Sequence, residues 1–143
     1  MKLAVGCDHG AVDLKNQLIK HLQEKGYEVI DKGTYTKESC DYPAYAKQVC
    51  ESVLSNEAEL GILLCGTGIG MSMAANKIKG IRAALCSDCF SAQATREHNN
   101  ANVLCMGARV LGPGLALKIA DTFLEAKFSN DERHIRRINQ LED

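Results

Sequence analysis

The stretch from Cys65 to Gly70 combines a thiol with glycines at alternate positions, in the sequence CGTGIG. Such glycines let the backbone approach a ligand closely, and the helix predicted after them directs free N–H groups toward it. The loop is therefore a candidate anion cradle, with a merely tight turn as the alternative. It does not match G-x-G-x-x-G and has no P-loop lysine, so it predicts neither a dinucleotide nor a nucleoside triphosphate.

Cys65 adds possible chemistry to this loop. A thiolate at a helix N-terminus is stabilised by the helix dipole and can act as a nucleophile or as a base. The alternative is a buried structural cysteine at a strand end. If Cys65 is a base, the N–H groups beside it are suited to the negative charge of an enediolate oxygen.

Arginines near the end of the chain suggest a phosphate site. Arg133 and Arg137 have i, i+4 spacing, which puts both guanidinium groups on one face of a helix. Paired guanidinium groups bind phosphate well, because each offers a planar fork of donors. The alternative is a solvated charged face. Arg109, just after a predicted strand, is a third candidate contact.

Two histidines could transfer protons near neutral pH. His9 follows the first predicted strand, next to Asp8, and His98 precedes Asn99 at the end of a predicted helix. A polar turn residue and a helix cap are the respective alternatives. Cys86 and Cys89 form a C-x-x-C. No second cysteine pair completes a zinc site, so one buried and one helical cysteine is favoured over a redox pair.

These residues are placed by alternating short apolar runs and amphipathic segments, which is typical of a parallel α/β sheet. The predicted strands are Leu3–Cys7, Tyr27–Asp31, Leu60–Cys65, Ile81–Cys86 and Asn102–Gly107. Ligands of such sheets bind beyond the carboxyl ends of the strands, near the point where strand order reverses. We expect the candidate residues, including His98 and Asn99, to gather at that one edge.

The helical segments follow from apolar spacing. One begins near Ala11 and is ended by Gly26, and another is opened by Pro113. The segment from Asp131 to Leu141 carries a narrow apolar stripe. It predicts a C-terminal helix that docks on another surface, such as a second subunit. The 143 residues contain no linker or repeat, so one domain spanning 1–143 is expected.

Composition excludes several classes of protein. A net charge of −1 gives no global attraction to nucleic acid or to an anionic membrane, and no apolar run is long enough to span a bilayer. The N-terminus lacks a signal-peptide core, so we expect a cytoplasmic protein with reduced cysteines. No metal-ligand cluster is evident.

The motifs GCDHGA, DKGTY before DYP, CGTGIGMSMAANK and REHNNANVLCMGAR together closely resemble the type B ribose-5-phosphate isomerases. The related galactose-6-phosphate isomerase subunits share much of this pattern. The resemblance extends from Met1 to about Arg137. It implies a Rossmann-like three-layer α/β/α sandwich, and a homodimer whose active sites are shared between subunits, with a tetramer left open.

The resemblance also implies the chemistry. Ribose 5-phosphate and ribulose 5-phosphate are interconverted through a cis-enediolate, without a metal or organic cofactor. Cys65 matches the proton-transferring base, and His98 matches the residue that helps to open the furanose ring. The remaining matches are substrate contacts at Asp8, His9 and Asn99, the oxyanion loop of Gly66, Thr67, Gly68, Ile69 and Gly70, and phosphate contacts at Arg109, Arg133 and Arg137. Thr67 is grouped with Cys65 and His98 as catalytic.

Two alternatives stay open. One keeps the chemistry but changes the substrate to a hexose 6-phosphate, of allose or of galactose. The other is a non-catalytic anion-binding module, or a redox protein that uses Cys86 and Cys89. A flavin is disfavoured, because the chain has no Trp and only 4 Tyr to stack on a ring.

Overall fold

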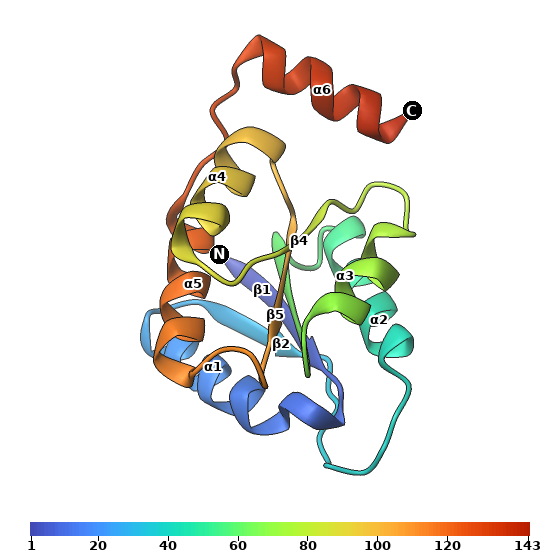
Figure 1. Cartoon of the computed structure of the whole chain (residues 1–143), viewed down its shortest axis with the longest axis vertical. Helices are drawn as coiled ribbons and strands as arrows, with labels where there is room; N and C mark the ends of the chain where they lie inside the picture. Colours follow the sequence, from blue (N-terminus) through green and yellow to red (C-terminus); the bar gives the residue numbers. More distant parts are fainter.

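The apolar runs of the sequence pair side by side as a fully parallel sheet in the computed structural model, which describes residues 1–143 (Figure 1). The strands are β1 (Lys2–Cys7), β2 (Glu28–Asp31), β3 (Leu60–Cys65), β4 (Ala83–Leu85) and β5 (Val103–Gly107). All five predicted strands are confirmed. β4 is shorter than expected at both ends. At its start, the Arg82 N–H bonds the side-chain Oδ1 of Asn102 at 2.8 Å instead of a backbone carbonyl of the neighbouring strand.

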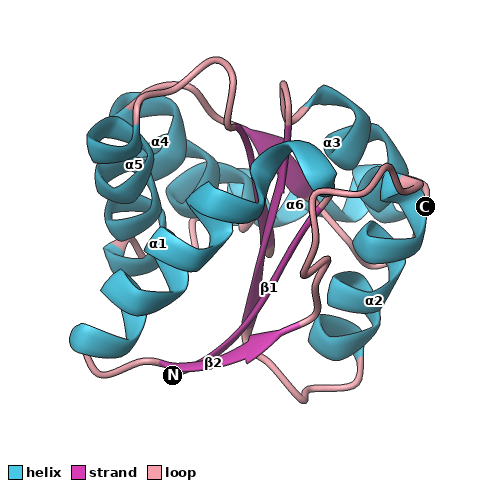
Figure 2. Cartoon of the chain, turned by 90° about the horizontal axis from the view of Figure 1, so that it is seen from below, coloured by secondary structure: helices cyan, strands magenta, loops and turns pink.

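Helices cover both faces of the sheet, so the predicted three-layer sandwich is confirmed (Figure 2). Helices α1, α4 and α5 lie on one face, and α2 and α3 lie on the other. The helices are η1 (His9–Ala11), α1 (Val12–Glu24), α2 (Tyr42–Leu54), α3 (Ile69–Asn76), α4 (Cys89–Asn99), α5 (Pro113–Glu125) and α6 (Glu132–Glu142). None of them is long and apolar enough to cross a membrane.

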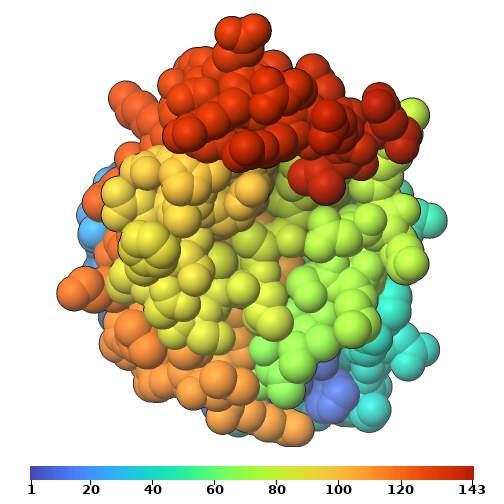
Figure 3. Space-filling view, turned by 45° about the horizontal axis from the view of Figure 1, so that its top comes forward, coloured from blue at the N-terminus to red at the C-terminus, as the bar shows by residue number.

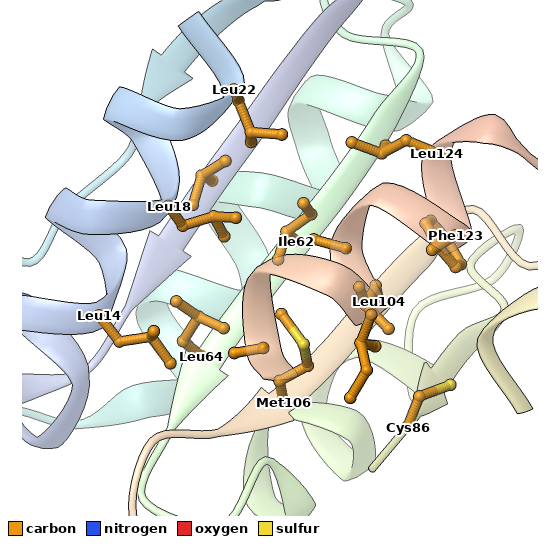
Figure 4. Packing of buried hydrophobic residues seen from close by; sticks show 14 of the residues in the cluster. Leu14, Leu18, Leu22, Ile62, Leu64, Cys86, Leu104, Met106, Phe123 and Leu124 are labelled. Atoms are coloured by element: carbon orange, nitrogen blue, oxygen red, sulfur yellow. The ribbon is translucent and has the colours of Figure 1, made fainter. Parts of the chain in front are cut away.

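Alternation along the strands divides the core in two, since successive side chains of a strand point to opposite faces. Ile62 and Leu64 pack with the leucines of α1 and with Phe123 of α5 (Figure 4). Leu63 and Cys65 face the other way, into the cluster built by α2 and α3. The loop after β3 is therefore anchored by buried side chains on both faces.

The strand order β2-β1-β3-β5-β4 identifies where a ligand is expected. From β1 the chain adds β2 on one side and then β3 on the other, so strand order reverses between β1 and β3. Open α/β sheets bind ligands outside the carboxyl ends of the strands that flank such a point. Asp8 follows β1 and Gly66 follows β3, so both loops border this position.

Candidate active site

The loop after β3 holds the Cys65 sulfur against its own backbone. The Gly68 N–H donates to Cys65 Sγ at 3.0 Å, and the Ile69 N–H donates to Thr67 Oγ1 at 3.2 Å. The N–H groups of Gly66 and Thr67 have no hydrogen-bond partner within the chain. The loop thus places unpaired backbone donors beside a thiol, which is the arrangement that an oxyanion requires.

The Cys65 side chain is itself buried beneath this loop, with only 5% of the residue exposed. It packs in the cluster that α2 and α3 form on their face of the sheet. This burial agrees with the alternative interpretation of Cys65 as a structural cysteine. The hydrogen bond from Gly68 nevertheless ties its sulfur to the turn that precedes α3.

Arg109 joins the loops after β1, β3 and β5. The backbone N–H of Arg109 donates to the Gly66 carbonyl at 2.9 Å, and this bond holds the start of the Arg109 side chain at the loop after β3. A methyl group on Gly10 would lie 3.6 Å from Arg109 Nη2, and one on Gly66 would lie 3.4 Å from its Cδ. The exposed guanidinium group therefore lies across both glycines. The Asp8 carboxylate accepts the Gly10 N–H at 2.9 Å and fixes the first loop.

His9 is oriented by a backbone group that the sequence analysis missed. Its Nδ1 accepts the N–H of Cys40 at 3.3 Å, so the proton of a neutral ring resides on Nε2. His9, Lys37 and Arg109 line a cavity of about 410 Å³ at this edge. Three groups that can donate hydrogen bonds to an anion thus surround one space.

Two further residues near the site had no predicted role. Lys37 has a surface ion pair with Asp13. The ring of Tyr42 lies close to Gly70. A methyl group on Gly70 would lie 2.7 Å from Tyr42 Cζ. The DYP motif contains Tyr42, but nothing in its local sequence indicates a contact with a loop 28 residues away.

The prediction that His98 and Asn99 belong to this same edge is wrong within one chain. They end α4, and a helix that connects two parallel strands returns the chain to the amino edge of the sheet. Cys65 aligns with Gly107, the last residue of β5, whereas Asn99 precedes the first. The length of β5, roughly 13 Å, therefore separates the two groups.

Arg133 and Arg137 lie with His98 rather than with Cys65. Both belong to α6, which contacts α4 and lies beyond the amino edge of the sheet (Figure 1). Both side chains are exposed, and Arg133 has a weak ion pair with Asp131 at 3.5 Å. The arginines do share an exposed helix, as their spacing predicts. One chain thus divides the predicted site residues between opposite edges.

His98 is packed against a second histidine. Its ring centroid is 4.7 Å from that of His134 in α6, and His134 Nδ1 is hydrogen-bonded to Ser129 Oγ at 2.8 Å. Burial and the neighbouring His98 lower the pKa of His134. A neutral His134 therefore accompanies His98 at neutral pH.

The C-x-x-C pair resolves as one buried and one helical cysteine. Cys86 is buried, and desolvation followed by the nearby Asp88 carboxylate raises the pKa of its thiol to about 11. Cys89 is the first residue of α4. A thiol that stays protonated is a poor nucleophile, so the geometry gives little support to a redox pair. No three His, Cys, Asp or Glu side chains are grouped as a metal site.

Known proteins resemble the chain over nearly its whole length. A family model described as Ribose/Galactose Isomerase matches residues 3–141. Ribose-5-phosphate isomerase B of Escherichia coli is 50% identical, covering 98% of this chain and 93% of that protein. A galactose-6-phosphate isomerase subunit of Clostridium acetobutylicum is 45% identical, over 99% of this chain and 83% of its own length.

A solved structure agrees with the sequence comparison. The crystal structure of a ribose 5-phosphate isomerase from Thermotoga maritima is 53% identical and superposes with a TM-score of 0.96. The match covers 99% of this chain and 97% of that one. Sequence and fold agree over the full length, and the chain belongs to the ribose/galactose isomerase family.

Proposed function

We propose that the chain is an aldose–ketose isomerase that interconverts ribose 5-phosphate and ribulose 5-phosphate. The observation that carries this proposal is the Cys65 sulfur held 3.0 Å from the Gly68 N–H, beside the unpaired N–H groups of the same loop. The named activities of the relatives from Escherichia coli and Thermotoga maritima support the choice of substrate.

In the proposed reaction Cys65 acts as a base. Its thiolate removes the proton from C2 of the open-chain aldose and returns it to C1, while the hydroxyl proton passes from O2 to O1. The negative charge of the intermediate enediolate falls on oxygen, where the N–H groups of the Gly66–Gly70 loop stabilise it. Asp8 and His9 hold the sugar, and Arg109 holds the phosphate together with Arg133 and Arg137 of a second copy of the chain. That remote binding energy positions the reacting carbons.

The sites are proposed to be completed by a second copy of the chain. One chain separates Cys65 from His98, the proposed ring-opening group, by the length of β5. Exposed apolar side chains surround the Cys65 loop on α3, the edge strand β4 and the start of α4; they are Ile69, Met73, Leu85 and Phe90. A two-fold related copy covering this face would bring His98 and Asn99 of each chain toward the Cys65 loop of the other.

The test of the base is Cys65→Ala, with Cys86→Ala as the matched control. We expect Cys65→Ala to lower kcat by about 100- to 10,000-fold, the usual contribution of a general base. Cys86→Ala should keep the rate and still introduce solvent deuterium into recovered sugar phosphate. Full activity in Cys65→Ala, or activity lost only in Cys86→Ala, would contradict the proposal.

The shared site has its own test, in which Cys65→Ala and His98→Gln chains are mixed after subunit exchange. Half of the dimers then contain both chains, and each has one intact site of two, so about a quarter of wild-type activity returns. Each variant alone stays inactive. A mixture as inactive as its components would place both residues in the site of a single chain.

A second substrate has one specific argument in its favour, the 45% identity to the galactose-6-phosphate isomerase subunit. The comparison of kcat/KM for ribose 5-phosphate with those for galactose 6-phosphate and allose 6-phosphate decides between them. We expect the pentose to be preferred. A higher kcat/KM for either hexose 6-phosphate would show that it, and not ribose 5-phosphate, is the preferred substrate. The proposed role of Cys65 would stay unchanged.

A further inference from the structure

Most hydrogen bonds of the Arg82 guanidinium group go to the turn that ends α4. Its Nε donates to the carbonyls of Asn99 at 3.1 Å and Asn100 at 3.3 Å, and its Nη2 donates to the Asn100 carbonyl at 2.9 Å. The last carbonyls of a helix lack partners within it, and a cation there also offsets the helix dipole. Arg82 therefore fixes the backbone that carries His98 and Asn99.

The remaining nitrogen of the Arg82 guanidinium group, Nη1, contacts α6. Nη1 donates to Glu142 Oε1 at 2.6 Å, and the two side chains are only 20% and 30% exposed. This ion pair lies at the C-terminal end of α6. The beginning of α6 is held separately, where the His134 ring packs against the His98 ring at a tilt of 37°.

A hollow adjoins the second of these attachments, at the C-terminal end of α6. A cavity of about 620 Å³ lies among the segment before β4, the end of α4 and the end of α6, with Arg82, Asn99 and Glu142 in its lining. Figure 3 shows α6 lying across α4, with its far end over the segment that precedes β4. Since little of α6 packs on the rest of the chain, its direction depends on the His98–His134 contact and on the Arg82–Glu142 ion pair.

We propose that Arg82 is a positioning residue, which with Glu142 sets the distance between the α4 turn and the arginines of α6. The inference rests on the proposed function for the roles of His98, Arg133 and Arg137. If α6 turned about its first residues, Arg133 and Arg137 would move relative to His98. The Arg82–Glu142 pair holds the phosphate-binding and ring-opening groups in one fixed geometry.

Inorganic phosphate is the probe, because it reports on the arginines without requiring turnover. Glu142→Ala should weaken the binding of phosphate about fivefold, the equivalent of roughly 1 kcal/mol for a partly exposed ion pair, and leave kcat within twofold. Arg82→Lys should weaken phosphate binding equally and also lower kcat, since it loosens the α4 turn. Glu132→Ala, an exposed glutamate at the start of the same helix, is the matched control and should change neither.

The double variant Arg82→Lys/Glu142→Ala separates positioning from general damage. If the two residues act through one contact, phosphate affinity falls no further than in either single variant. Phosphate affinity unchanged in Glu142→Ala, additive losses in the double variant, or no phosphate binding by the wild-type chain would each overturn the proposal. A wild-type chain that binds phosphate but does not isomerise ribose 5-phosphate would refute the proposed function instead.

Discussion

Gly68→Ala is the sharpest test of the loop that follows β3. Gly68 has φ = 80°, and a methyl group there would lie 2.6 Å from Leu85 Cδ1 and 2.8 Å from the carbonyl carbon of Met106. The left-handed backbone costs about 1–2 kcal/mol for alanine, and overpacking adds about 1–3 kcal/mol, so the free energy of unfolding should fall by about 2–5 kcal/mol. For a domain of this size that corresponds to a decrease in Tm of roughly 6–20 °C.

Activity should fall by more than the loss of stability explains. Relief of the contact with the Met106 backbone requires the loop to shift, and Gly68 is the residue whose N–H bonds Cys65 Sγ at 3.0 Å. Loss of one preorganised oxyanion-type donor costs about 100- to 1,000-fold in kcat. We expect a loss of this size at temperatures where the variant is still folded.

Two matched glycine substitutions isolate the causes. Gly26 also has a positive φ, 94°, but a methyl group there meets nothing within 4 Å, so Gly26→Ala should lower Tm through backbone strain alone. Gly114 lies in the first turn of α5 with open space around it, so Gly114→Ala should keep or slightly raise Tm. Both should retain wild-type kcat.

The assays are thermal unfolding followed by circular dichroism and the isomerisation of ribose 5-phosphate at 25 °C or below. One result would refute the reasoning: a Gly68→Ala protein with the Tm of Gly26→Ala and the kcat of wild type. It would mean that the loop accommodates the methyl group, and that its backbone does not take part in the reaction.

Two other predictions concern α6. Replacement of both Arg133 and Arg137 by alanine should mainly raise KM for the sugar phosphate, and unchanged steady-state kinetics would reduce the pair to surface charge. Since burial and His98 lower the pKa of His134 in the folded chain, the unfolded chain binds more protons as pH falls below the ordinary histidine value of about 6.5. Stability should therefore decline below that pH, and His134→Gln should flatten the dependence of Tm on pH between 5 and 7; an identical slope would exclude His134 as the cause.

Much of the fold was predictable from local sequence. The apolar runs that became β1, β3 and β5 are nearly continuous, and the helices follow regular apolar spacing with a glycine or proline at a boundary. The carboxyl-edge part of the site was predictable for the same reason. Any residue that directly follows a parallel strand lies at that edge, as Asp8 and the glycine loop after Cys65 do.

The errors came from relations between distant segments. The sequence analysis predicts His98 at the same edge as Cys65, but the end of a crossover helix lies at the opposite edge from the end of a strand. The contact of Cys40 with His9 joins residues 31 positions apart, and the Arg82–Glu142 ion pair spans 60 positions.

The sequence by itself determined which residues become strands, which helices cover them, and which loop carries a thiol beside glycines, because backbone conformation and apolar periodicity are local properties. Only the tertiary structure decided that the candidate residues form two groups at opposite edges of one sheet. Strand order, the direction of each helix and long-range side-chain contacts depend on how distant segments pack, and no local pattern encodes that packing.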